Sequence, residues 1–182
     1  MILYVNACVR PESRTDRIAR ALLEKLGGEY EELNLADMNL TPVLNDTLEK
    51  RTELITSGSF DDPMFEPARK FASADRIVIA SPFWDMSFSS LLKVFIENIY
   101  VIGIVSEYDD SGRSHGLCKA DKLYYVTTAG GHYIQDYSYD YIKSIASVFG
   151  IGTTELISAD MLDVDGFDAE KIVSDTILSI TV

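Results

Sequence analysis

The sequence predicts an α/β fold in which helices cover both faces of a mostly parallel, five-stranded sheet. Short apolar runs of strand length alternate with longer segments whose apolar residues recur at helical spacing. One run, Ile77–Ala80, is continuously apolar, which is typical of a strand buried on both faces. Parallel neighbours need a connecting element between them, and the helical segments provide it.

Each predicted element follows from its local pattern. In the first helix Ile18, Leu22 and Leu26 recur at helical spacing, and Gly27-Gly28 ends it. The predicted strands are Ile2–Val5, Tyr30–Leu35, Ile77–Ala80, Leu123–Val126 and Glu155–Ile157. The predicted helices are Thr15–Leu26, Thr47–Thr56, Phe65–Ala74, Ser89–Tyr100, Tyr139–Phe149 and Ala169–Ile180. The turn-rich stretch Tyr108–Gly116 is expected to be a loop or a hairpin.

Length and composition narrow the classes of protein. The 182 residues contain no repeat or low-complexity linker, so we expect one domain spanning residues 1–182. The net charge of −13 argues against a nucleic-acid partner. No apolar run has the length of a membrane span and the first residues do not read as a signal peptide, so we expect no membrane association.

The cysteines indicate a protein of a reducing compartment, and the histidines indicate that it has no zinc site. Cys8 and Cys118 form no CxxC pair and no disulfide framework, so a cytoplasmic location is expected. His115 and His132 have no Cys or His cluster nearby, so no zinc site is expected. Ligands of such a fold bind outside the carboxyl ends of the strands, which directs attention to the loops that follow strands one, three and four.

The first of these loops, Ala7–Thr15, runs into the start of a helix. The free N–H groups and the dipole of a helix start favour an anion. Ser13, Arg14 and Thr15 would complete a phosphate site. An ordinary capped helix explains the same residues, and this loop taken alone favours that simpler interpretation. The loop matches neither GxxxxGK[ST] nor GxGxxG.

The second loop, Ser81–Ser89, carries an unusual density of apolar and aromatic residues. Exposing Phe83, Trp84 and Met86 is costly unless something flat packs on them, so Phe83–Met86 is predicted to bind a ring. The alternative is that these side chains fill the core between the sheet and the next helix. We expect that role for Phe88.

The third loop, Thr127–Tyr133, contains Gly130-Gly131, which permits close approach of the backbone to a ligand. A tight turn is the simpler alternative. Each loop is ambiguous alone. Together they offer a phosphate site, an aromatic wall and a row of backbone donors at one edge of the sheet, which favours a flat, phosphate-bearing ring system over a sugar or a peptide.

Four segments of the chain also carry a family resemblance. They are SPFWDMSFSSLLKVFIENI from Ser81, TTAGG from Thr127, YDDSGRSHGL from Tyr108 and FGIGTTELISAD from Phe149. With them the chain resembles the flavodoxin-like NAD(P)H:quinone oxidoreductases, specifically the FMN-dependent NADH-azoreductase branch, over nearly its whole length. The resemblance implies a flavodoxin-like three-layer sandwich with a five-stranded parallel sheet of order 2-1-3-4-5.

The resemblance also implies a role for each loop. Ser13, Arg14 and Thr15 would hold the FMN phosphate. The ring system would be lined by Pro82, Phe83, Trp84, Asp85 and Met86. Its pyrimidine side would be bordered by Thr128, Ala129, Gly130 and Gly131. The chain departs from the family pattern at three places: Ala7 and Cys8 stand where an early serine is usual, Asp85 replaces an Asn, and His132 directly follows the glycines.

The activity implied is an FMN-dependent oxidoreductase. A hydride from NADH or NADPH would pass to flavin N5, and a quinone, azo compound or similar flat small-molecule acceptor would then take two electrons. No catalytic side chain is expected, because the flavin carries the chemistry, and the family relationship implies a homodimer. Two alternatives on the same fold stay open: a flavodoxin-type electron carrier, and an interaction module that has lost FMN.

Overall fold

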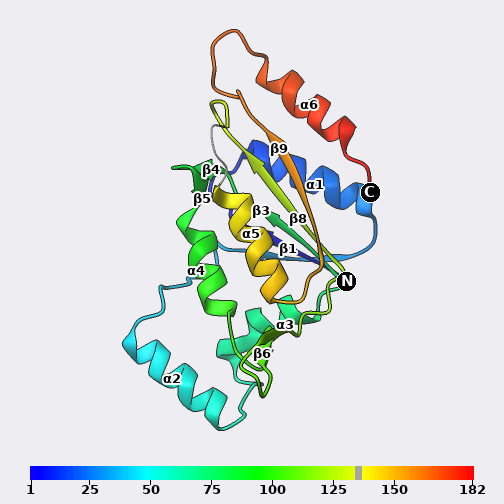
Figure 1. Ribbon diagram of the computed structural model, residues 1–182. Coiled ribbons are helices and arrows are strands. Elements are labelled where there is room, and N and C mark those ends of the chain that lie inside the picture. The colour runs from blue at the N-terminus through cyan, green and yellow to red at the C-terminus, as the bar shows by residue number, and fades with distance from the viewer. Residues whose placement is uncertain (134–136) are drawn as a thin grey trace.

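A five-stranded, wholly parallel sheet forms the middle layer of the protein (Figure 1). The computed structural model describes residues 1–133 and 137–182. The strand order is β2-β1-β3-β8-β9, which confirms the predicted order 2-1-3-4-5. The strands are β1 (Ile2–Asn6), β2 (Tyr30–Asn34), β3 (Arg76–Ala80), β8 (Lys122–Thr128) and β9 (Thr153–Ala159).

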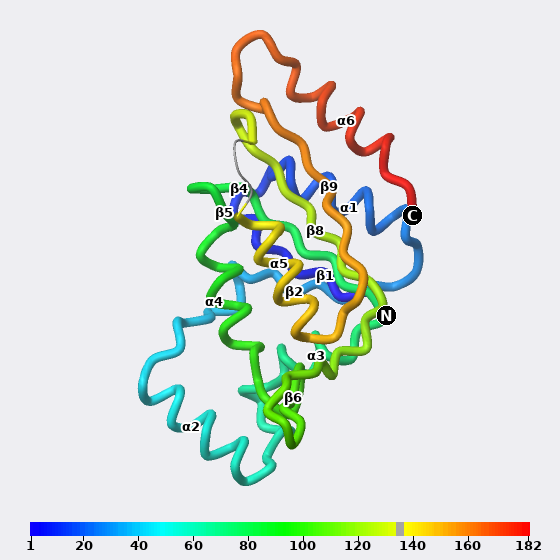
Figure 2. The backbone as a smooth tube through the Cα atoms, in the orientation of Figure 1, coloured from blue at the N-terminus to red at the C-terminus, as the bar shows by residue number. Residues whose placement is uncertain are grey.

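Helices cover both faces of this sheet. One face carries α1 (Arg14–Leu26) and α6 (Ala169–Ser179), and the other carries α3 (Glu66–Ser73), α4 (Ser90–Ile99) and α5 (Tyr137–Val148). A 3₁₀ turn, Pro63–Phe65, precedes α3. The remaining helix, α2 (Asn45–Thr56), has no buried residue and projects from the body of the molecule (Figure 2). The six predicted helices are therefore confirmed, with ends that differ by a few residues.

Two short hairpins stand outside the main sheet. The pair β6 (Ser106–Tyr108) and β7 (Ser114–Gly116) shows that the stretch Tyr108–Gly116, expected to be a loop or a hairpin, belongs to a hairpin that begins at Ser106. The pair β4 (Phe83–Trp84) and β5 (Ser87–Phe88) occupies a segment that was predicted to be a loop. Strands of two residues leave too short an alternating pattern to be recognised in a sequence.

Burial of β1, which lies between β2 and β3, divides the core into two. Every residue of β1 is buried, and alternate side chains face opposite layers. Leu3 and Val5 pack with α3, α4 and α5, whereas Tyr4 packs with α1 and α6. In the larger half, the Phe71 ring lies 5.8 Å from the Phe149 ring, centroid to centroid, and 6.3 Å from that of Phe95. Within the described residues, no helix is both long and apolar enough to cross a membrane.

We predict that Phe71→Ala lowers the free energy of unfolding by about 3–5 kcal/mol, because the cavity adds to the loss of apolar burial. Urea denaturation followed by circular dichroism measures the change. Phe167→Ala is the matched control, since its side chain is 53% exposed and its loss should change the unfolding free energy by under about 0.5 kcal/mol. Equal effects of the two substitutions would contradict this description of the core.

Candidate functional site

A cavity of about 310 Å³ opens at the carboxyl ends of the parallel strands. This is the edge at which ligands bind in open α/β sheets. Its walls come from the loops that follow β1, β3, β8 and β9. The lining residues are Val9, Arg10, Glu12, Ser13, Arg14, Thr15, Pro82, Phe83, Trp84, Thr128, Ala129, Gly130, Leu162 and Asp163.

The start of α1 forms one wall. Ser13 caps the helix, its Oγ accepting from the Asp16 N–H at 3.3 Å. The first N–H groups of a helix have no partner within it, so this wall presents donors to an anion. The hydroxyls of Thr15 and Thr128 lie 2.6 Å apart, and because only one of them donates to the other, one hydroxyl hydrogen is left for a ligand.

Charged groups of both signs surround this helix start. The Arg14 Nη1 donates to the Leu162 carbonyl at 3.0 Å and to Asp163 Oδ1 at 2.8 Å. Arg10 and Glu12 line the same cavity. The side chains of Arg14 and Asp163 are 37% and 71% exposed, so solvent screens their ion pair. The cavity is therefore locally balanced in charge, although the whole chain carries −13.

The β4–β5 hairpin forms the apolar wall. Its two turn residues, Asp85 and Met86, have φ of 50° and 67°, as a two-residue type I′ hairpin requires. Aspartate tolerates this conformation, but methionine at the second position, where glycine is favoured, does not, so the turn holds backbone strain at Met86. The turn presents Trp84, which is 40% exposed, while the Phe83 ring packs edge-on against Tyr133 with centroids 4.7 Å apart.

Buried serines anchor the base of this hairpin. The Ser89 N–H donates to Ser81 Oγ at 3.1 Å, and the Ser89 hydroxyl donates to the Ala7 carbonyl at 3.4 Å. Ser81 and Ser89 are both buried. These bonds tie the hairpin to the end of β1, so the aromatic wall and the first loop keep a defined spacing.

The glycine loop is held by the segment that follows β9. The N–H groups of Met161 and Asp163 donate to the carbonyls of Gly131 and Gly130 at 3.1 and 2.9 Å. A Cβ on Gly130 would lie 2.5 Å from Asp163 Oδ2 and 3.2 Å from Asp163 Cβ, so glycine at this position lets the Asp163 side chain pack against the loop. The group that approaches Gly130 this closely is a protein carboxylate.

A histidine–carboxylate pair lies at the outer edge of the same loop. His132 Nδ1 is 2.7 Å from Asp160 Oδ2, which also accepts from the Tyr133 N–H at 3.3 Å. The pair does not line the cavity, and the His132 side chain is 77% exposed. Among residues 1–133 and 137–182, no group of three or more His, Cys, Asp or Glu is placed to hold a metal ion.

The structure brings most of the predicted site residues together. The following lie around the cavity: Ser13, Arg14, Thr15, Pro82, Phe83, Trp84, Thr128, Ala129 and Gly130. Asp85, Met86 and Gly131 do not line it, and Asp85 instead borders a neighbouring hollow of about 500 Å³ with Trp84 and Lys93. Ala7 and Cys8, where the chain departs from the family pattern, are buried and also lie outside the lining.

The wall of the cavity that follows β9 was not predicted from the sequence. Leu162 and Asp163 follow β9, whereas only the loops after the first, third and fourth strands were considered. The rule that ligands bind at the carboxyl ends of parallel strands applies equally to this strand, and it was the available signal. Val9, Arg10 and Glu12 fall within the first loop but were not singled out.

Comparisons with known proteins show the family and the fold of the chain. Residues 1–179 match the model of a protein family that is described as having a flavodoxin-like fold. The FMN-dependent NADH:quinone oxidoreductase of Clostridium beijerinckii is 32% identical, over 97% of this chain and 93% of its own. The enzyme of the same name from Coprothermobacter proteolyticus is 31% identical, over 96% and 92% of the two chains.

Solved structures show the same fold. A Bacillus anthracis azoreductase superposes with a TM-score of 0.83 at 19% identity, covering 97% of this chain and 94% of its own. A Bacillus anthracis FMN-dependent NADH-azoreductase in complex with FMN gives a TM-score of 0.79 at 24% identity, with coverage of 97% and 93%.

We predict that Met86→Gly raises the free energy of unfolding by about 0.5 kcal/mol. Glycine removes the steric cost of the left-handed backbone at this position, and this gain is partly offset because glycine also increases the conformational entropy of the unfolded chain. Chemical denaturation measures the difference. Ser87→Gly is the control, since Ser87 lies in β5 without a positive φ and glycine there should destabilise. A loss of stability in Met86→Gly would show that the turn is not strained.

We predict that the Cys8 thiol resists alkylation in the folded protein at pH 8. Burial raises the pKa of Cys8 to about 11, and burial raises the pKa of Cys118 to about 12. Unfolded thiols ionise near 9, so the folded state holds these protons more tightly. The resulting stability is fully present below pH 9 and is lost as the pH rises towards 11.

Iodoacetamide labelling with mass spectrometry tests this behaviour in Cys118→Ser, where Cys8 is the remaining thiol. Labelling at pH 8 should be slow in the native protein and complete in urea. Rapid native labelling at pH 8 would refute the raised pKa.

Proposed function

Because the chain belongs to the flavodoxin-like family of FMN-dependent NADH:quinone oxidoreductases, we propose that it binds FMN and reduces a quinone or an azo compound with NADH. The observation that carries this proposal is the pairing, in one cavity, of a capped helix start with an exposed aromatic wall. The first suits a phosphate group and the second suits a flat ring. NADH is the proposed donor, which agrees with the names of the relatives and with an acidic surface that offers no clamp for an extra phosphate.

The residues around the cavity fit FMN chemically. Its volume of about 310 Å³ lies within the range of ligand pockets, about 300–1,000 Å³. One end supplies hydroxyl, guanidinium and helix N–H donors, which match a phosphate monoester. The other supplies Trp84 and Phe83, which match an apolar ring. Ala129 and Gly130 also line the cavity, and their small size leaves space for a ligand.

In this proposal each wall has one task. Ser13, Thr15 and the first turn of α1 bind the phosphate, and Arg14 neutralises part of its charge. Phe83 and Trp84 exclude water from the ring site, which strengthens electrostatic interactions there. Bound FMN supplies hydride-accepting chemistry, so no catalytic side chain is needed. The chain's contribution is to bind and orient.

We also propose a homodimer in the cytoplasm. Large apolar side chains are exposed at the start of α2 and around the β4–β5 hairpin, among them Leu44, Leu48 and Met86, and a second copy would cover such surface. Both cysteines are free thiols, which agrees with a reducing compartment. Light scattering should give a mass near twice the 20.3 kDa of the chain. A mass of one chain would contradict the dimer.

The visible spectrum of the purified protein, followed by NADH consumption with menadione, tests the activity. We expect flavin absorbance after FMN is added, and menadione-dependent oxidation of NADH. FMN that is bound but not reduced by NADH would favour an electron carrier instead. Protein that takes up no FMN would favour an interaction module.

We predict that Trp84→Ala weakens the binding of FMN and riboflavin alike, by about tenfold, since aromatic packing contributes about 0.5–1.5 kcal/mol beyond its buried area. Flavin fluorescence titration measures both dissociation constants. Phe167→Ala, which removes an exposed ring outside the cavity lining, is the control and should leave both constants unchanged. A loss confined to FMN would place Trp84 at the phosphate instead of the ring.

A further inference from the structure

The Asp163 carboxylate lies beside the N-terminus of α1, where the free N–H groups favour an anion. Asp163 lines the cavity opposite α1, and its Oδ1 accepts from Arg14 Nη1 at 2.8 Å. The same nitrogen donates to the Leu162 carbonyl at 3.0 Å. Both hydrogens of Nη1 are thus directed at the segment that follows β9, leaving the other guanidinium N–H groups for a ligand.

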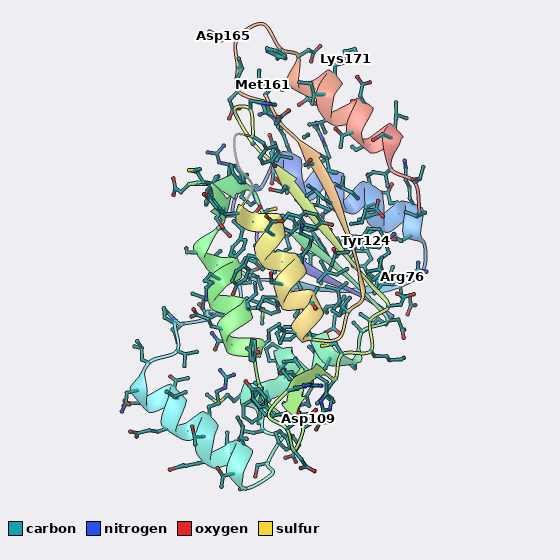
Figure 3. The ribbon with its side chains drawn as sticks, viewed as in Figure 1. Arg76, Asp109, Tyr124, Met161, Asp165 and Lys171 are labelled. Carbon is teal, nitrogen blue, oxygen red and sulfur yellow. The ribbon has the colours of Figure 1, made fainter. Side chains whose placement is uncertain are left out.

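The position of this carboxylate is determined by backbone bonds. Asp163 N–H donates to the Gly130 carbonyl at 2.9 Å, and Leu162 N–H donates to the Ala129 carbonyl at 3.3 Å. Met161, with φ of 62°, turns the chain back onto the glycine loop. Figure 3 labels Met161 and Asp165 on this segment between β9 and α6.

Gly130 has no side chain, and the Asp163 carboxylate occupies the space that this leaves. Asp163 Oδ2 lies where a side chain at this position would begin, since a Cβ on Gly130 would come within 2.5 Å of it. Asp163 therefore packs directly on the loop that borders the cavity. Its negative charge is a built feature of the wall, and it faces the same arginine that an incoming phosphate would need.

We propose that Asp163 lowers the affinity of this cavity for phosphate monoesters by competing with them for Arg14. The assignment of FMN as the phosphate-bearing ligand rests on the proposed function above. A phosphate that enters between Ser13 and Arg14 meets a like charge and must draw Arg14 away from Asp163. Asp163 thereby determines how strongly the protein distinguishes FMN from riboflavin, which has the same ring system without the phosphate.

Asp163→Asn tests the proposal through binding, without reference to turnover. Titration of apoprotein, followed by flavin fluorescence, should show FMN bound about two- to fivefold more tightly than by the unchanged protein, because a like charge near the phosphate has been removed and solvent screens part of its effect. Riboflavin should bind equally well to both. Asp165→Asn is the matched control: it removes the same charge from an exposed residue of the same segment that does not line the cavity, and FMN affinity should stay unchanged.

Three results would overturn the proposal. FMN bound more weakly or equally by Asp163→Asn would show that Asp163 orients Arg14 or has no effect. A similar gain for riboflavin would place the effect at the ring. A similar gain in FMN affinity in Asp165→Asn would show that the effect comes from the change in net charge and not from the position of Asp163.

Inorganic phosphate separates this inference from the proposed function. If no variant binds a flavin, the proposed function fails, and phosphate is then titrated against the fluorescence of Trp84, which is the single tryptophan and lines the cavity. Tighter phosphate binding by Asp163→Asn than by the unchanged protein and Asp165→Asn supports competition at Arg14. Equal or weaker binding overturns it.

Discussion

Complete burial of β1 between two parallel neighbours is the constraint on which the rest of the structure depends. A parallel strand requires a crossover to its neighbour, and the crossovers place helices on both faces. Because both faces of β1 are covered, Leu3 and Tyr4 enter different halves of the core. All five carboxyl ends meet at one edge of the sheet, and the cavity lies there.

At that edge the walls come from segments distant in sequence, and each is held by a different physical device. Helix α1 presents unsatisfied donors. The β4–β5 hairpin presents aromatic surface through a turn that holds Asp85 and Met86 in left-handed conformations. The segment after β9 bonds to the glycine loop and brings Asp163 to Arg14. The strained turn thus lies at this edge, and backbone strain is common at binding sites.

The net charge of the chain is a poor guide to the charge of the cavity. The chain carries −13, yet its cavity is lined by two arginines and two carboxylates. The cofactor proposed here is itself an anion, so its binding depends on hydroxyls, helix N–H groups and the remaining donors of Arg14. Local geometry decides the balance, because solvent screens the distant acidic surface.

The sequence by itself determined the order of strands and helices, the fold class, and the three loops that carry most of the cavity lining. Periodicity and helix-start chemistry are local properties, so Ser13, Phe83 and Gly130 could be identified from their neighbours in the chain. Only the tertiary structure decided that Phe83–Phe88 is a strained hairpin and that Asp163 meets Arg14. The first depends on a left-handed backbone that Met86 does not favour by itself. The second joins residues 149 positions apart, and no local pattern records which carboxylate an arginine will meet across a folded sheet.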